Sequence, residues 1–244
     1  MLLQSFGTNY FPSRESIDLR APHDQRQVIG TMPVCSIDDL AEVIKQAKII
    51  QKEWSQRSVE ERVSAIEPFG SLIEAHLHEL VEVLKTEQGM LDSVVRREVQ
   101  ESITQIKHTL DVSREELASI YRADGSFGAE IMKVPYGIIA AIVPWNAPVS
   151  LATAKVIPAL MAGNAVIIKP SPRAPNGVTK FLDLLRSCLP PGLISVLHGL
   201  DELGEAMIKH KEIRKISFTG STAVGKRVAV AAAAELKSVQ LELG

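Results

Sequence analysis

The sequence has few cysteines, no strong charge of one sign and no long uninterrupted apolar run. Its 244 residues include two cysteines, Cys35 and Cys188. Their spacing fits no metal-binding motif and two thiols do not make a disulfide framework, so we expect no metal site and a reducing compartment. The net charge of −2 gives no sign of a nucleic-acid partner.

The longest apolar region, residues 136–170, is broken by Pro144, Pro148 and Pro158 and carries Lys155. A membrane-spanning helix needs about 20 predominantly apolar residues. This region therefore predicts buried strands and helices, and no membrane partner. The first residues have no basic segment that leads into an apolar run, so we expect no signal peptide and a cytoplasmic protein.

Residues from about 37 to 121 have apolar residues at helical spacing among many charged ones. Ser36 is placed to cap a first helix. Ser58 opens a second helix, with Glu61 at the capping-box position, which is expected to run to Gly89. A third helix is expected from about 92 to 121.

The second half of the chain alternates short β-rich runs with helical ones. Strand–helix alternation with short links predicts an α/β fold built on a parallel sheet covered on both faces. The expected strands lie within residues 164–170, 190–199, 213–220 and 237–243, and the expected helices are 176–189, 201–210 and 221–235.

A glycine-rich junction near the end of the sequence resembles a phosphate-binding loop. Gly220, Gly225 and Lys226 match most of G-x-x-x-x-G-K, but Arg227 stands where such a loop has Ser or Thr. Arg227 cannot supply a hydroxyl to Mg²⁺, which argues against nucleotide hydrolysis. A strand that runs into a helix can still hold a phosphate on backbone N–H groups without a metal. The alternative is that Ser221 only caps the helix.

Four motifs occur in an order that resembles the NAD(P)-dependent aldehyde dehydrogenase superfamily. They are PWN at 144–146, GNAVIIKPS at 163–171, FTGST at 218–222 and LELG at 241–244. The resemblance implies N-terminal helices packed on a Rossmann-like parallel sheet, with the family's catalytic domain absent. It implies one cofactor-binding domain over residues 1–244. Its parts would be a helical region to about 117, possible oligomerisation strands at about 118–135, and a parallel α/β portion from about 136.

The implied function is oxidation of an aldehyde to a carboxylic acid with NAD or NADP as cofactor. Asn146 resembles the family residue whose amide stabilises negative charge on the carbonyl oxygen. Glu242 resembles the general base that activates water, and an acidic residue among apolar neighbours on a strand suggests a buried carboxylate. Taken alone, Asn146 could be a turn residue and Glu242 an outward-facing one.

The resemblance also implies a set of cofactor-binding residues, with Lys169 on ribose hydroxyls and the junction at Ser221 on the pyrophosphate. The full set is Ile142, Pro144, Trp145, Asn146, Lys169, Ser171, Gly199, Phe218, Thr219, Gly220, Ser221, Val224 and Gly225. Many NAD-preferring members have Glu three residues after the lysine, where this chain has Pro172 followed by Arg173. A carboxylate would repel the 2′-phosphate of NADP, and Arg173 could attract it, so the choice between NAD and NADP stays open.

The family's cysteine nucleophile lies downstream of the LELG motif, and neither Cys35 nor Cys188 matches it. We therefore expect a truncated chain that is inactive alone, and a parent that acts on a small aldehyde as a homo-oligomer. Two alternatives remain open. One is a fragment of a relative that passes the acyl group to coenzyme A, and the other is a cofactor- or subunit-binding module without catalysis.

Overall fold

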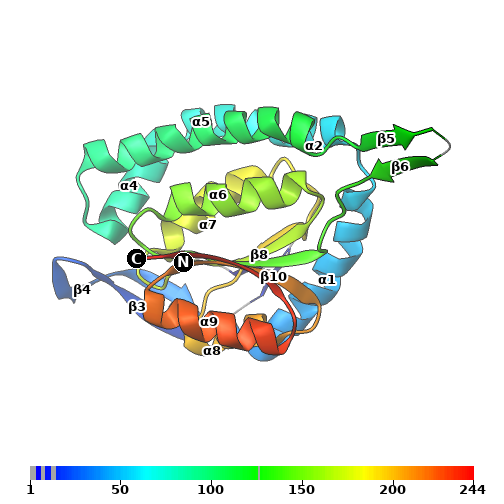
Figure 1. The fold of residues 1–244 in the computed structure, drawn as a ribbon. Helices are drawn as coiled ribbons and strands as arrows, with labels where there is room; N and C mark the ends of the chain where they lie inside the picture. Colours follow the sequence, from blue (N-terminus) through cyan, green and yellow to red (C-terminus); the bar gives the residue numbers. More distant parts are fainter. Residues whose placement is uncertain (1–3, 7–8, 12–14, 126) are drawn as a thin grey trace.

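The computed structural model describes residues 4–6, 9–11, 15–125 and 127–244, and its largest sheet has seven strands (Figure 1). The strand order is β11 (Ser238–Leu243), β10 (Ile213–Gly220), β7 (Ile138–Ile142), β8 (Ala165–Lys169), β9 (Ile194–Val196), β1 (Gln4–Phe6) and β2 (Asn9–Phe11). The five strands from β11 to β9 are parallel, whereas β1 and β2 add antiparallel strands beyond β9.

Helices cover both faces of this sheet (Figure 1). One face is covered by α1 (Ile37–Ser55), α8 (Asp201–Lys209) and α9 (Thr222–Ala234), and the other by α6 (Pro148–Met161) and α7 (Pro175–Arg186). An outer layer packs on α6 and α7. It consists of α2 (Val59–Ile66), α3 (Pro68–Ala75), α4 (Leu77–Gln88) and α5 (Asp92–Glu116).

The central strands are apolar on both sides because both sides are covered. All five residues of β8 are buried, as are four of the five residues of β7. Continuous apolar strands of this kind are typical of a parallel sheet between helices. The predicted α/β class is confirmed, and so are the strands and helices expected after residue 164.

The N-terminal helices were predicted only in part. Ser36 caps α1 as expected and also forms a capping box with Asp39, and Ser58 forms the expected capping box with Glu61. Gly89 ends α4 with a φ of 67°. The single helix expected between Ser58 and Gly89 is wrong, because the chain forms α2, α3 and α4 there. Pro68 lies in the first turn of α3, where its missing N–H costs no intrahelical bond and where it starts a new helix instead of continuing the old one.

One hairpin was not predicted, and a second lies within the segment expected to form strands at about 118–135. β3 (Ser16–Ala21) pairs with β4 (Asp24–Pro33), so the region before residue 37 is not helical where the structure describes it. β5 (Ile120–Asp124) pairs with β6 (Phe127–Ile131), so the third helix ends at Glu116 and not at 121. Within the described ranges, no helix is both long enough and apolar enough to cross a membrane.

Candidate functional site

The strand order creates a switch point between β7 and β10. From β7 the chain builds β8 and β9 on one side, and it then returns to place β10 on the other side of β7. In open parallel sheets, ligands bind outside the carboxyl ends of the strands at such a point. The loop that follows β7 carries Asn146, and the junction that follows β10 carries Ser221, so both leave the sheet at this switch point.

The loop after β7 is open to solvent. The side chain of Asn146 is exposed and Trp145 is 40% exposed, whereas Pro144 is half-buried. The amide of Gln88, at the end of α4, donates a hydrogen bond of 3.0 Å to the carbonyl of Trp145. The Asn146 amide is therefore held on a tethered loop and is accessible from outside.

The junction after β10 is the start of α9. Ser221 is its N-cap, and its hydroxyl accepts from the backbone N–H of Val224 at 3.4 Å. The capping interpretation is thus confirmed. Anion binding by the same N–H groups stays a prediction. Because the serine hydroxyl is uncharged and its hydrogen bond is long, the positive end of the helix dipole stays largely uncompensated.

The other helices that follow the parallel strands have carboxylates at their N-termini. Glu98 accepts from the first N–H groups of α6 and Glu87 from those of α7. Asp201 and Glu202 lie in the first turn of α8. α9 has a serine cap and no acidic residue in its first turn. Among the four helices that follow β7 to β10 in the described part of the chain, α9 therefore offers an anion the least repulsion.

Strand register divides the site between the two faces of the sheet. Thr219 is the partner of Glu242, and Phe218 is the partner of both Leu241 and Ile142. Paired residues share a face and successive residues alternate. Thr219 and Glu242 therefore project on the side of α6, and Phe218 and Ile142 on the side of α8 and α9.

On the α6 side lies Lys155, the lysine that interrupts the apolar region of residues 136–170. Lys155 of α6 is 7% exposed, and its Nζ donates a hydrogen bond of 3.0 Å to the hydroxyl of Ser217. Burial lowers the pKa of Lys155 to about 8, and the charge of Glu242 partly opposes this shift. A lysine within an otherwise apolar helix was the sequence signal that could have identified it.

Glu242 itself is exposed, which corrects the expectation of a buried carboxylate. The physical reason is that β11 is the edge strand of the sheet among the described residues, so its side chains lack a neighbouring strand. Gln240 donates a hydrogen bond of 3.3 Å to the Glu242 carboxylate.

Thr219 provides a direct test of whether this edge suits a bound ligand. Its hydroxyl oxygen is buried and has no hydrogen-bond partner in the described structure. Buried hydroxyls normally have a partner. The next residue, Gly220, has no room for a side chain, because a Cβ there would lie 2.6 Å from Cζ of Phe218. The arrangement fits a polar ligand that lies against the end of β10.

On the opposite face, a cleft of about 280 Å³ lies between α8 and α9. Four of the expected cofactor-binding residues line it, namely Ile142, Lys169, Phe218 and Val224. Lys169 is 7% exposed, and burial lowers its pKa against the opposing influence of Asp201 and Glu202. Arg227, which departs from the phosphate-loop pattern, also lines this cleft. An apolar cleft with a few polar groups is typical of sites for small organic ligands.

Other expected residues lie outside that cleft. Ser171 accepts from the backbone N–H of Arg173, and Gly199 packs so closely on Leu203 that a Cβ would lie 2.7 Å from its Cδ2. Gly225 is similarly closed by Leu243. Pro144 and Asn146 do not line the cleft that contains Lys169, although the loops after β7 and β8 leave the sheet at the same edge.

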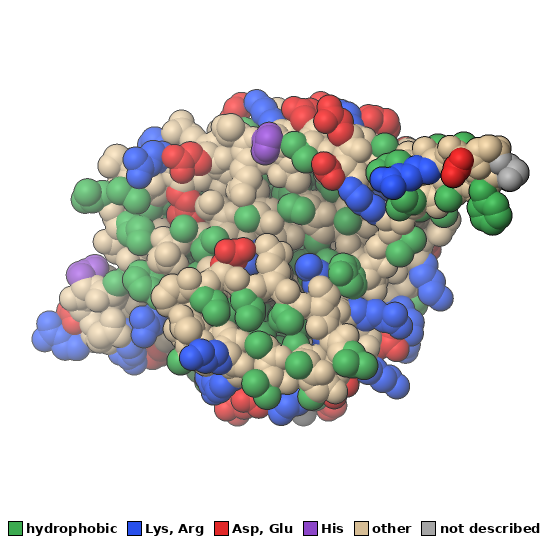
Figure 2. All heavy atoms as spheres, viewed as in Figure 1, with side chains coloured by type: hydrophobic (Ala, Val, Ile, Leu, Met, Phe, Trp, Pro, Cys, Tyr) green, Lys and Arg blue, Asp and Glu red, His purple; other side chains and the backbone are tan. Residues whose placement is uncertain are grey.

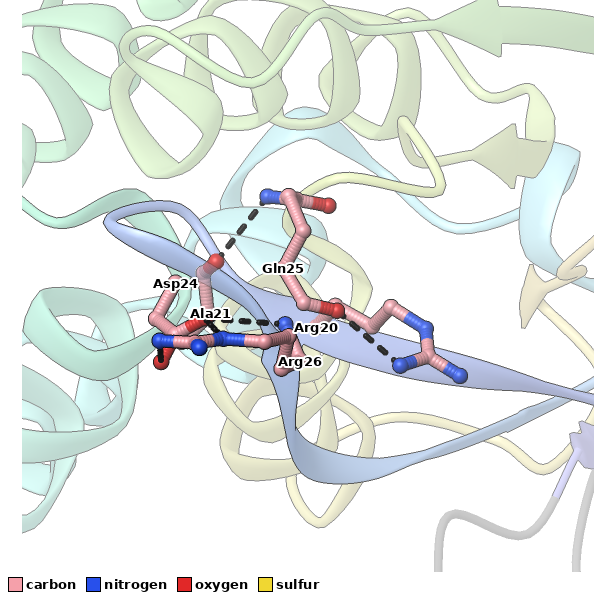
Figure 3. Close-up of polar contacts among 5 residues, drawn as sticks. All are labelled: Arg20, Ala21, Asp24, Gln25 and Arg26. Atoms are coloured by element: carbon pink, nitrogen blue, oxygen red, sulfur yellow. Dashed lines mark hydrogen bonds and ion pairs between the residues drawn. The ribbon is translucent and has the colours of Figure 1, made fainter.

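Trp145 and Arg173 line a different cleft, of about 480 Å³, which faces the β3–β4 hairpin. The guanidinium carbon of Arg173 lies 5.9 Å from the centre of the Trp145 ring. The hairpin wall is braced by Arg20, which donates to the Gln25 carbonyl at 2.9 Å, and by Gln25, which donates to the Ala21 carbonyl at 2.9 Å (Figure 3). Arg173 is therefore directed away from the cleft that contains Lys169, and its expected attraction for a 2′-phosphate stays a prediction.

Neither cysteine lies at the switch point between β7 and β10. Cys35 precedes α1, where its backbone N–H donates to the His198 carbonyl, and burial raises the pKa of its thiol to about 12. Cys188 is half-buried just after α7 and packs against the core. Both positions agree with packing roles.

Comparison with known proteins shows which family has this architecture. The model of the aldehyde dehydrogenase family matches residues 10–244. The chain is 34% identical to aldehyde dehydrogenase LUC3 of a Fusarium species, over 89% of this chain and 45% of that protein. It is 32% identical to the D-glyceraldehyde dehydrogenase (NADP(+)) of Thermoplasma acidophilum, again over 89% of this chain and 45% of that protein.

Among solved structures, the NADP-dependent glyceraldehyde-3-phosphate dehydrogenase of Bacillus halodurans, complexed with NADP, superposes with a TM-score of 0.93 at 30% identity. The match covers 99% of this chain and 52% of that one. PnpE in complex with nicotinamide adenine dinucleotide gives a TM-score of 0.93 at 28% identity, covering 99% and 50%. The chain thus spans about half the length of the relatives it matches, and it belongs to the aldehyde dehydrogenase family.

Proposed function

We propose that this chain is the cofactor-binding domain of an enzyme that oxidises an aldehyde to a carboxylic acid, and that it binds NAD or NADP at the carboxyl edge between β7 and β10. The observation that carries the proposal is the start of α9. Its N-terminal N–H groups face no acidic cap, whereas carboxylates lie at the N-termini of α6, α7 and α8. A pyrophosphate is the group that such a helix start favours.

The neighbouring groups support the same position. The unpartnered hydroxyl of Thr219 suits the polar end of the ligand, and the cleft beside Lys169 suits its adenosine end. When bound, the nicotinamide cofactor accepts a hydride from the substrate. Arg227 and Lys169 both line the cleft, and no carboxylate stands at position 172, so the site accommodates either cofactor.

Two residues of this chain, Asn146 and Glu242, have definite tasks in the proposed oxidation. The side-chain amide of Asn146 is exposed on its loop and would donate to the substrate oxygen as negative charge develops there. Glu242 is open to solvent beside Thr219 and would take a proton from the water that releases the acid. The thiol that forms the covalent intermediate is not supplied by Cys35 or Cys188, so we expect these 244 residues alone to turn over no aldehyde.

Lys169→Ala tests the binding site. The purified chain is titrated with NADP⁺ and with NAD⁺ by calorimetry. We expect the variant to bind about tenfold more weakly, because one charge-assisted hydrogen bond of about 1.5 kcal/mol is lost. Lys107→Ala, an exposed lysine on α5, is the control and should leave the affinity unchanged. Measurable binding that Lys169→Ala leaves unaltered would refute the assignment.

A second function, assembly with a further copy of the chain, is favoured by the β5–β6 hairpin. All of its residues that the structure describes are exposed, and they include several large apolar side chains (Figure 2). Exposed apolar side chains gathered in one place mark an interaction surface. The exposed fractions are 49% for Ile120, 76% for Tyr121, 81% for Phe127 and 47% for Ile131.

Phe127→Glu tests this assembly. We expect the variant to raise the dissociation constant of a homo-oligomer at least about tenfold, because a buried interface aromatic is replaced by a charge. Light scattering coupled to size exclusion measures the mass. Leu91→Glu, 74% exposed at the start of α5, serves as the matched control. An equal effect of both variants, or a wild-type chain that is monomeric at all concentrations, would contradict the proposal.

A further inference from the structure

The two helices that follow the loops of the proposed site have no caps of their own. The N-cap of α6 is Ala147 and that of α7 is Ala174, and neither side chain can accept a hydrogen bond. Their backbones are nearly the same, with φ and ψ of −145° and 61° at Ala147 and −150° and 60° at Ala174. A proline follows each of them. Orphan N–H groups at buried helix starts need partners from elsewhere.

The partners come from the outer helical layer. Oε1 of Glu98 on α5 accepts from Val149 at 2.8 Å and from Ser150 at 3.1 Å. The two carboxylate oxygens of Glu87 on α4 accept from Asn176 at 2.7 Å and Gly177 at 2.8 Å. These contacts join residues that are 51 to 90 positions apart in the sequence.

Both carboxylates are almost completely buried. Glu87 is 4% exposed and Glu98 is 9% exposed. Burial raises the pKa of each, for Glu87 to about 7, while the hydrogen bonds from the backbone N–H groups oppose the shift. A carboxylate is unfavourable in such a place unless its hydrogen bonds offset the loss of water. The two caps therefore depend on the geometry of those N–H groups.

The loop that carries Asn146 is held at a second point. Gln88 is 6% exposed, and its amide donates to the carbonyl of Trp145. The peptide before Asn146 is thus tied to α4, and the helix two residues after it is tied to α5. Asn146 makes no hydrogen bond to any residue that the structure describes, so its place depends on these flanking contacts.

We propose that Glu98 and Gln88 are positioning residues that hold the Asn146 loop at the sheet edge, and that Glu87 does the same for the loop after Lys169. This inference rests on the proposed function, because it assigns both loops to the site. The outer layer of helices α2 to α5 would then hold the site in place as well as cover the core. Neither Glu98 nor Glu87 touches the reacting atoms.

Three variants separate this role from ordinary packing. Glu98→Leu keeps much of the volume and removes the acceptor, Glu98→Gln keeps the acceptor and removes the charge, and Glu101→Leu is a control on the same helix. Glu101 has a side chain that is 68% exposed and pairs only with Arg97 among the ion pairs described. Amide hydrogen exchange of the ligand-free chain is followed at Val149 and Ser150 and, for comparison, along β8.

We expect Glu98→Leu to speed exchange at Val149 and Ser150 about tenfold, the effect of losing a helix cap, with β8 unchanged. Glu98→Gln should return those rates to within about twofold of the wild type, because its carbonyl oxygen still accepts both hydrogen bonds. NADP⁺ affinity should fall with Glu98→Leu and recover with Glu98→Gln. Equal rates in Glu98→Leu and Glu101→Leu, or the absence of rescue by Glu98→Gln, would overturn the proposal.

If Glu98→Leu does not fold, Gln88→Met gives the same test through the carbonyl of Trp145. Faster exchange confined to residues 145–150 supports the proposal, and unchanged exchange there contradicts it. The exchange measurement needs no cofactor. A wild-type chain that binds neither NAD⁺ nor NADP⁺ would therefore contradict only the proposed function. The exchange rates would still decide the role of Glu98.

Discussion

Trp54→Ala is expected to lower the free energy of unfolding by about 3–5 kcal/mol, the largest loss of stability that we predict for a single substitution. Trp54 is 1% exposed, and its indole N–H donates to the Leu160 carbonyl at 2.8 Å. Alanine would remove the ring from the contact between α1 and the end of α6 and leave a cavity there. Denaturant unfolding followed by far-UV circular dichroism measures the change without relying on tryptophan emission.

The other tryptophan is the natural comparison. Trp145 is 40% exposed, and its structured contact with α4 uses its backbone carbonyl, which alanine retains. Trp145→Ala should therefore change the free energy of unfolding by less than about 1 kcal/mol. Similar losses for both variants would mean that Trp54 does not carry the packing assigned to it.

The C-terminal end of α6, which Trp54 contacts, is held by further hydrogen bonds from the N-terminal helices. Arg62 donates to the Met161 carbonyl at 2.7 Å, and Gln51 donates to the Gly163 carbonyl at 2.9 Å. These side chains from α1 and α2 satisfy the carbonyls that a helix end leaves without partners. Since Glu98 caps the opposite end, α6 is bound at both ends by the N-terminal helices.

Local patterns predicted those elements whose cause is local. The apolar run of β8, the helix caps at Ser36 and Ser58, and the junction at Ser221 depend on residues within a few positions of one another. Pro68, which marks the start of a new helix, was visible in the sequence, but the prediction of one helix from Ser58 to Gly89 did not take it into account. The β3–β4 hairpin lacks a strong turn signal, and it was not predicted.

Features that depend on distant contacts could not be predicted in this way. The residues that cap α6 and α7 lie on other helices, and glutamates on amphipathic helices are ordinarily exposed. Glu242 was expected to be buried because its sequence neighbours are apolar, but its exposure is set by the edge position of β11. The directions of Arg173 and Arg227 likewise follow from the loop and helix that carry them.

Lys155→Met is expected to raise the free energy of unfolding at pH 7 by about 2 kcal/mol. The pKa of Lys155 is about 8 in the folded chain, below its ordinary value of 10.5, because burial disfavours the charged form. Each unit of pKa corresponds to about 1.4 kcal/mol, so the penalty from burying the charge exceeds the gain from one hydrogen bond to Ser217. Methionine has a similar length and no charge to desolvate.

The pH dependence provides the sharper test, because the sign is fixed by the direction of the shift. Below pH 8 both the folded and the unfolded chain carry the charge, and the full penalty applies. Between pH 8 and 10.5 the unfolded chain binds more protons than the folded one, so the contribution of Lys155 to stability rises with pH. The stabilisation by Lys155→Met should therefore shrink across that range, whereas Lys107→Met, on an exposed lysine, should show no such trend.

The pH dependence of stability is compared between the wild type and Lys155→Met. Taking the difference also removes the opposing effect of Cys35, whose raised pKa lowers stability as the pH rises above 9. A Lys155→Met variant that is less stable than the wild type at pH 7 would show that the hydrogen bond to Ser217 and the opposite charge of Glu242 outweigh the cost of burial. If the variant is more stable, Lys155 is a residue that weakens the fold at the place where the candidate site lies. Strained or destabilising residues of that kind are typical of functional sites, and Lys155 would then join Asn146 and Glu242 as a candidate for the chemistry at this edge of the sheet.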